Sequence, residues 1–166
     1  MVLFVQNDIK NLEKIVEAYE NLLWVYVRWC GFAANYIGEK YGDREAMDFF
    51  RYLGDRLAVE EFKATGSAAE LVKYQKADLE LLGADLTFTE DDEKAVLLVN
   101  QCNSGGRMER EGLIEPMKKG LTDNVKWPHY CLHCGIWYNE IAQKHGLKIK
   151  FERKANGRGC AWIGHK

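Results

Sequence analysis

The sequence predicts an α+β fold in which N-terminal helices precede two antiparallel β-hairpins joined by a helical connection, in the order ααα-ββ-αα-ββ. Three observations predict it. Apolar residues recur at three- and four-residue spacing through the first half of the chain, two later regions contain short alternating or apolar runs, and Gly and Pro interrupt the stretch between those regions. A chain of 166 residues is long enough for one domain with its own core. We therefore expect a single domain over 1–166, with a helical part at 1–83 and a cysteine-rich ββαββ part at 84–166.

The first predicted helix is unusually rich in apolar and aromatic residues. Asn7 and Asp8 are good N-cap residues, and Gly38 or Gly42 is expected to end the helix. Such an apolar stripe usually belongs to a core, and the alternative is a seam through which two copies form a homodimer. The stripe consists of Ile9, Leu12, Ile15, Val16, Tyr19, Leu22, Leu23, Tyr26 and Val27, widened by Trp24, Trp29, Phe32 and Tyr36.

Two further helices are predicted before the first hairpin. Asp43 is expected to cap the second helix, and Ser67 with Glu70 has the capping-box spacing that begins a third helix, which ends near Gly83. The residues of the second helix expected to point inward are Met47, Phe50, Leu53, Leu57 and Phe62.

The second half of the chain supplies the strands. The first hairpin is expected from two runs, 84–89 and 95–99, around a polar turn. One or two short helices are expected between Ser104 and Lys126, followed by a helix that begins at Pro128 and stops at Gly146. The last hairpin pairs the alternating run 147–152 with a strand that carries Cys160 and Trp162 on one face, across a turn at 155–158.

Charge and composition narrow the function classes. The formal net charge is -2, and basic residues are interleaved with acidic ones, so a nucleic-acid partner is not expected. No apolar run approaches the roughly 20 residues of a membrane-spanning helix. The first residues do not resemble a signal peptide, so we expect a cytoplasmic protein without a membrane partner. In a reducing compartment five cysteines, an odd number, are better interpreted as thiols or metal ligands than as disulfides.

The cysteines of the second half form the most informative pattern. Cys131 and Cys134 are three residues apart, which on a helix places both sulfurs on one face and in a loop forms half of a zinc site. The alternative is that these cysteines fill the core, as we expect for Cys30. The other candidate zinc ligands are Cys102, Cys160, His129, His133 and Glu152.

The same residues also suggest a nucleophile. A cysteine in the first turn of a helix feels the positive end of the helix dipole, so Cys131 and Cys134 both qualify, and a histidine such as His129 or His133 can relay its proton. Cys102 qualifies too, because the amides of Gly105 and Gly106 can form an anion nest after it. Arg107 and Arg110 lie one turn apart and either clamp a carboxylate or form surface ion pairs.

The order of motifs from Val99 onward resembles a known family. Asn-Gln-Cys102, then Cys131-x-x-Cys134, then Phe151-Glu152-Arg153, and finally Gly159-Cys160-Ala-Trp162 are similar to the L-2-amino-thiazoline-4-carboxylic acid hydrolases and their cysteine-rich relatives. The pattern is more distantly similar to vinyl-reductase-type small-molecule-binding domains. Both resemblances imply an α+β domain around a small-ligand pocket. The second also implies a metal site built from cysteines and a carboxylate, whose matching positions here are Cys131 or Cys134, Glu152 and Cys160.

Two functions follow as expectations. The first is a cysteine-centred hydrolase, with or without a metal, that cleaves a C–N or C–S bond of a small cyclic carboxylate-bearing substrate, with Cys102, Cys134 and His133 catalytic. Arg107 or Arg110 would hold the carboxylate, and Trp137 and Trp162 would line the substrate site. The second is a vinyl-reductase-type binding module with a structural zinc site and no catalysis, whose aromatic pocket also includes Trp24 and Trp29.

Overall fold

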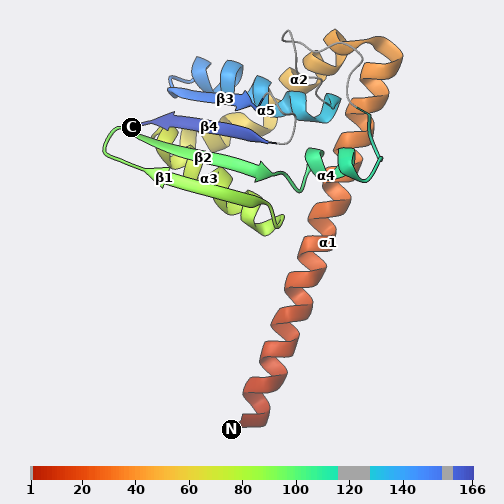
Figure 1. Ribbon diagram of the computed structural model, residues 1–166, viewed down its shortest axis with the longest axis vertical. Helices are drawn as coiled ribbons and strands as arrows, with labels where there is room; N and C mark the ends of the chain where they lie inside the picture. The colour runs from red at the N-terminus through yellow and green to blue at the C-terminus, as the bar shows by residue number, and fades with distance from the viewer. Residues whose placement is uncertain (1, 116–127, 155–158) are drawn as a thin grey trace.

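The computed structural model describes the backbone of residues 2–115, 128–154 and 159–166, with side chains in those ranges except at 2–10, 61 and 64. The predicted fold class is confirmed. Three N-terminal helices precede two hairpins, which join in one antiparallel four-stranded sheet with a helical connection between them (Figure 1). The predicted turn at 155–158 and the later part of the predicted connection, 116–126, lie outside the described residues.

Helix α1 spans Val2–Tyr41, and its N-terminal half extends away from the rest of the molecule (Figure 1). Asn7 and Asp8 therefore lie within the helix, so the prediction that they cap it is wrong. The helix ends at Gly42, whose φ of 111° favours glycine. Gly38 is instead a packing position, because a Cβ there would lie 2.1 Å from the ring of His129. None of the helices in the described ranges is long and apolar enough to cross a membrane.

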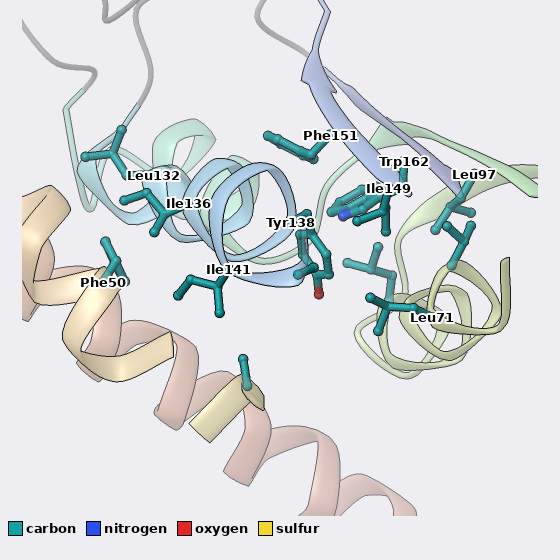
Figure 2. Packing of buried hydrophobic residues seen from close by; sticks show 14 of the residues in the cluster. Phe50, Leu71, Leu97, Leu132, Ile136, Tyr138, Ile141, Ile149, Phe151 and Trp162 are labelled. Carbon is teal, nitrogen blue, oxygen red and sulfur yellow. The ribbon is translucent and has the colours of Figure 1, made fainter. Parts of the chain in front are cut away.

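Helices α2 (Asp43–Ala64) and α3 (Ala68–Leu81) begin where the sequence predicts. The hydroxyl of Ser67 accepts a hydrogen bond from the Glu70 amide at 3.2 Å, which caps α3. In α2, Phe50 is buried and faces Leu132 and Ile136 (Figure 2). The expectation that Leu57 points inward is wrong, since 56% of this residue is exposed.

The strand order in the sheet is β1-β2-β4-β3, formed by β1 (Asp85–Glu90), β2 (Lys94–Gln101), β4 (Cys160–His165) and β3 (Ile149–Arg153). The two hairpins thus join through β2 and β4, where Leu97 pairs with Trp162. Trp162 also pairs with Phe151 of β3, and these three side chains lie on the buried face of the sheet (Figure 2). Alternation along β1, β2 and β3 leaves the other face of these strands more exposed, as is common for antiparallel sheets.

A helical segment covers the buried face beside α3. It runs through η1 (His129–Cys131), α5 (Leu132–Ile136) and the π-helix η2 (Trp137–Ala142), and the chain turns away at Gly146 as predicted. From the π-helix, the Asn139 side chain donates to the carbonyl of Phe151 at 2.8 Å and accepts from its amide at 2.7 Å. These bonds provide partners for the backbone amide and carbonyl of Phe151 on the outer edge of β3, where no further strand pairs.

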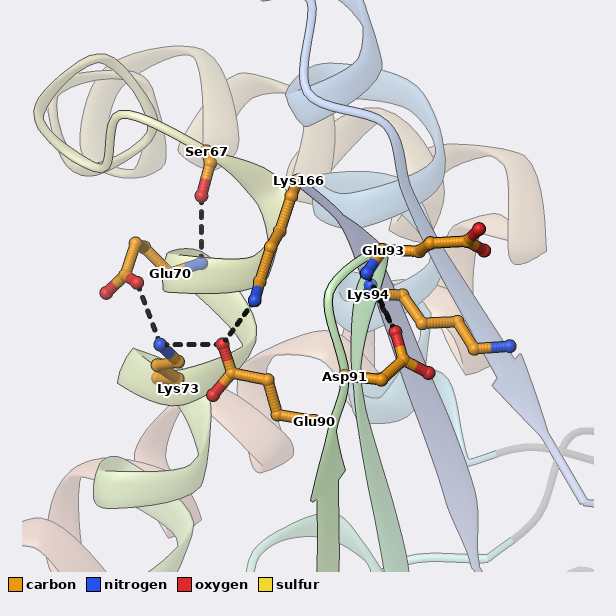
Figure 3. A network of polar contacts seen from close by, with 8 residues as sticks. All are labelled: Ser67, Glu70, Lys73, Glu90, Asp91, Glu93, Lys94 and Lys166. Atoms are coloured by element: carbon orange, nitrogen blue, oxygen red, sulfur yellow. Dashed lines mark hydrogen bonds and ion pairs between the residues drawn. The ribbon is translucent and has the colours of Figure 1, made fainter.

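Charged residues link α3 to the sheet at the end of β1, next to the β1–β2 turn. Lys73 contacts both Glu70 and Glu90, and Glu90 also contacts Lys166 of the C-terminus, at 2.9 to 3.2 Å (Figure 3). The carboxylate of Asp91 accepts from the amides of Glu93 and Lys94 and so closes the β1–β2 turn. Exposed pairs of this kind are worth little singly, but the network holds the hairpin against the helix it packs on.

A cysteine-lined cavity as the candidate functional site

A cavity of about 780 Å³ lies where β2 and β3 end and β4 begins. Its other walls come from the middle of α1, the C-terminal end of α3, the short helix α4 (Gly105–Arg110) and the segment Tyr130–Cys134. The volume is typical of small-molecule sites. The apolar and aromatic lining includes Tyr19, Leu23, Tyr26, Val27, Leu79, Leu81, Leu82, Tyr130, Phe151 and Trp162.

Four cysteines that are far apart in the sequence line this one cavity. Cys102 follows β2, Cys131 ends η1, Cys134 lies in α5, and Cys160 begins β4. All of them are free thiols. Cys30 is not among the described residues that line the cavity and packs against the core instead. The structure therefore brings together the cysteines that the sequence singles out.

Cys134 and His133 form a direct pair. The Cys134 Sγ lies 3.2 Å from Nε2 of His133, and Nδ1 of the same ring lies 2.5 Å from the carbonyl oxygen of Tyr130. Because a carbonyl oxygen only accepts, Nδ1 carries the proton and Nε2 accepts from the thiol. The imidazole is enclosed by the rings of Phe50, Tyr130 and Trp137. Its burial lowers the pKa of His133 to about 4, so the ring is neutral at pH 7.

The same burial keeps the thiols of Cys131, Cys134 and Cys160 protonated. It raises the pKa of Cys131 to about 12, although the nearby Arg153 guanidinium opposes the shift. Burial also raises the pKa values of Cys134 and Cys160 well above the usual range of a thiol. The expectation that a helix N-terminus lowers the pKa of Cys131 or Cys134 is therefore wrong, since desolvation by burial is the largest cause of the raised pKa at both positions.

The buried imidazole predicts instability in acid. The unfolded chain takes up a proton at a histidine pKa near 6.5, whereas the folded chain does so only near 4. The contribution of His133 to the free energy of unfolding is thus fully present above pH 6.5. It is lost as the pH drops towards 4, which lowers the free energy of unfolding by about 3 kcal/mol. In urea titrations followed by tryptophan fluorescence, His133→Gln is expected to lack this part of the acid loss. The exposed His145→Gln is the control, and an unchanged pH dependence in His133→Gln would contradict the prediction.

The two predicted carboxylate-binding arginines occupy different places. Arg110 lines the cavity and donates to Asn103 Oδ1 at 2.8 Å. Arg107 faces the other way, where its guanidinium stacks 4.0 Å from the ring of Trp24 and pairs with Glu111 at 2.7 Å. The structure therefore keeps Arg110 at the site and gives Arg107 a packing role.

Arg153 is a cavity residue that the sequence interpretation misses. Its side chain is 5% exposed and pairs with Glu109 at 3.1 Å. A signal for it exists in the sequence, because Arg153 is two residues after Phe151 and a strand places such residues on the same face. Asp78, at the α3 wall, is a second missed residue, and burial raises the pKa of its carboxyl group.

The predicted metal set does not come together as a whole. Glu152 lies between Phe151 and Arg153 on β3, so it points to the opposite face, where it is exposed and pairs with Lys150. Among the residues whose side chains the structure describes, no three Cys, His, Asp or Glu side chains are arranged to hold a metal ion. The donor set of Cys131, Cys134, Glu152 and Cys160 therefore does not fit a zinc ion here, and the zinc prediction depends on the thiols alone.

Other predicted site residues serve packing. The indole of Trp137 donates to the Phe50 carbonyl at 2.9 Å and rests against Gly54, away from the cavity. Trp29 is 76% exposed and also lies outside the lining, whereas Trp162 belongs to it. His129 joins the helical segment to the α1–α2 corner, since its Nε2 lies 2.8 Å from Asp43.

The glycine pair after Cys102 has a packing explanation. A Cβ on Gly105 would lie 2.7 Å from the sulfur of Cys131 and 2.8 Å from the Tyr130 ring, so glycine lets α4 approach η1 closely. Cys102 itself contacts the hydroxyl of Ser104, with 3.0 Å between sulfur and oxygen. The anion nest expected at Gly105 and Gly106 remains a prediction, and close packing is what the structure demonstrates at Gly105.

The comparisons with known proteins leave the family open. A scan against models of protein families matched none of them, and a search of curated proteins found no similar sequence. The resemblance to thiazoline-carboxylate hydrolases and vinyl-reductase-type domains thus stays a prediction that depends on short motifs. The function proposed below is therefore based on the fold and the cavity.

Proposed function

We propose that this protein binds a small, mainly apolar molecule with an anionic group in the cysteine-lined cavity. The observation that carries the proposal is the cavity itself, about 780 Å³ in volume, with aromatic and aliphatic walls and a few polar groups facing inward. Five free thiols persist best in a reducing compartment, so a cytoplasmic location belongs to the proposal.

Arg110 is the group best suited to hold the anion. The ion pair between Arg153 and Glu109 already neutralises the other cavity arginine. The guanidinium of Arg110 contacts the neutral amide of Asn103, and no carboxylate pairs with it among the described residues. A carboxylate or sulfonate at the cavity rim can therefore gain a charge-assisted hydrogen bond without displacing an existing ion pair.

Binding fits the resting protonation states better than nucleophilic attack does. A thiol site built for attack usually holds a thiolate, stabilised by a nearby cation. Here burial raises the pKa values of Cys131, Cys134 and Cys160, and the imidazole beside Cys134 is neutral at pH 7. Protonated thiols are weakly polar and polarisable, and they suit the wall of an apolar ligand site.

A pair of fluorescent probes tests this proposal. Anilinonaphthalene sulfonate is anionic, and N-phenyl-1-naphthylamine is its neutral analogue. We expect both to bind one site, and Arg110→Gln to weaken the anionic probe about tenfold while leaving the neutral probe unchanged, since a hydrogen bond to a charged group is worth about 1.5 kcal/mol.

Arg107→Gln is the matched control for the probe experiment. It removes an arginine from the same short helix, but from outside the cavity, so the affinities for both probes are expected to stay at the wild-type values. To place the site, Leu82→Trp fills the cavity wall and is expected to abolish binding of both probes. Probe binding that survives Leu82→Trp, or an equal loss in the two arginine variants, would refute the proposal.

The second candidate is the hydrolase, and the contact between Cys134 and His133 favours it. The ring is oriented so that Nε2 can take the thiol proton as Sγ attacks the carbon of a C–N or C–S bond. His133 would then return this proton to the leaving nitrogen or sulfur, and water would release the acyl group from Cys134. Mass spectrometry distinguishes the two candidates, because only the hydrolase requires Cys134 to form a covalent adduct when the protein is treated with an activated carboxylic ester. His133→Gln is expected to prevent this adduct.

A further inference from the structure

Helix α1 carries two separate stripes along its length. The first consists of Val27, Gly31, Ala34 and Gly38, which are all buried against the body of the molecule. Small residues in this stripe let neighbouring side chains approach the helix, as Met108 does at Gly31. Packing within one copy uses this stripe and the partly buried residues beside it, Trp24, Cys30 and Ile37.

The second stripe is exposed and has the spacing of a coiled coil. Its members alternate by three and four residues, the spacing of positions a and d in a heptad repeat, and every one of them is exposed. At 1.5 Å per residue the stripe is about 36 Å long. We call it the heptad stripe; it consists of Leu12, Ile15, Tyr19, Leu22, Tyr26, Trp29, Ala33 and Tyr36.

The positions that flank the heptad stripe favour a second copy of the same chain as the partner. In coiled coils between different chains, charges at positions e and g commonly select the partner. Here each such position is uncharged, so two identical stripes meet without repulsion and without a requirement for complementary charge. These flanking residues are Asn11, Val16, Ala18, Leu23, Val25, Cys30, Phe32 and Ile37.

The opposite face of the helix argues against a lipid surface. An amphipathic helix that lies on a membrane usually has a polar face rich in Lys and Arg. Between Asn11 and Asn21, where side chains of the projecting half are described, the polar residues include three glutamates and one lysine, so this part of the face is acidic. They are Glu13, Lys14, Glu17, Glu20 and Asn21.

The exposed apolar area is sufficient for a stable pair. Leu22 and Trp29 are 66% and 76% exposed. An aromatic side chain buries roughly 150–250 Å² when fully covered, so half-covering the four aromatic residues of the stripe supplies roughly 300–500 Å² per copy. Its three large aliphatic residues, with the exposed Val16, Val25 and Phe32 beside them, raise this area to roughly 600–800 Å². The pair then buries roughly 1,200–1,600 Å², within the range of specific interfaces.

We propose that the heptad stripe pairs with the same stripe of a second copy of this chain. The midpoint of the stripe is near residue 24, so the partner helix lies alongside Tyr19 and Tyr26 whether the helices run parallel or antiparallel. Both tyrosines also border the cavity. The pairing does not depend on what the cavity binds.

Sedimentation velocity on the full chain tests this pairing. The wild-type protein is expected to sediment at twice the 19.1 kDa of one chain, and Leu22→Glu to raise the dissociation constant at least 100-fold. Asn21→Glu is the matched control, because it adds the same charge one residue away on the polar face and is expected to leave the dimer intact. Circular dichroism checks that both variants remain folded.

Three results would overturn the pairing. One is a wild-type monomer at 100 μM, and another is a dimer that Leu22→Glu leaves unchanged. The third is a monomer that co-sediments with phosphatidylcholine–phosphatidylglycerol vesicles through Leu22, which would assign the heptad stripe to a membrane surface.

Discussion

Raising the pH from 8 to 10 is expected to lower the free energy of unfolding by about 4 kcal/mol, because three thiols are held protonated in the folded cavity. In the unfolded chain Cys131, Cys134 and Cys160 ionise near the ordinary thiol pKa of 9, whereas burial raises each pKa in the folded protein, for Cys131 to about 12. Stability is complete below pH 9 and is lost as the pH rises towards the folded values, by about 1.4 kcal/mol per pH unit and thiol.

Urea unfolding at a series of pH values measures this loss. Each of the variants Cys131→Ser, Cys134→Ser and Cys160→Ser is expected to reduce the alkaline slope by about one proton, since serine does not ionise in this range. Cys30→Ser, which removes a thiol outside the cavity lining, is the control. Tyrosines also titrate near pH 10, so the comparison is made between variants. Equal slopes in the wild type and in all three cavity variants would show that the thiols are not shielded.

Gly164→Ala is expected to destabilise the protein by about 3 kcal/mol or more. A Cβ at this position of β4 would lie 2.2 Å from the carbonyl oxygen of Ala68 and 2.5 Å from its carbon. These are backbone atoms of α3, so the helix would have to move off the sheet. The effect is a loss of packing, and it would appear as a lower urea midpoint with an unchanged m-value.

Gly112→Ala separates packing from backbone strain. Gly112 has a φ of 67° and no atom within 4 Å of an added Cβ, so alanine there meets only the conformational cost, about 1 kcal/mol. If Gly164→Ala costs no more than Gly112→Ala, then α3 does not pack on β4 as closely as described.

Local patterns predict most of the secondary structure. Ser67 and Glu70 start α3 because the cap is made within one turn of the chain, and Gly146 ends the last helix through its own backbone conformation. Alternating apolar residues likewise predict strands, because the alternation is a property of residues that are close in the sequence. It also contains information that the functional interpretation leaves unused, since a strand with Phe151 inward has Glu152 outward and Arg153 inward.

The convergence of the four cavity cysteines depends on the sheet. Cys102 and Cys160 lie at neighbouring strand ends only because β2 pairs with β4, and sequence alone gives no strand order. Arg107 and Arg110 are equivalent candidates in the sequence. In the structure Arg107 stacks on Trp24 of α1, outside the cavity, and only Arg110 lines it. Asn139 of the π-helix forms hydrogen bonds with the backbone of Phe151 at the edge of β3, a tertiary contact that no local pattern predicts.

The sequence by itself thus determined the α+β class, the capped start of α3, the two hairpins and the grouping of thiols in the second half. Each of these depends on residues within a turn or a strand of one another. Only the tertiary structure decided that the four thiols share a cavity, that burial keeps Cys131, Cys134 and Cys160 protonated, and that Glu152, His129 and Trp137 serve elsewhere. Those outcomes depend on which distant segments come into contact and how much water they exclude. A local sequence pattern gives no information about either.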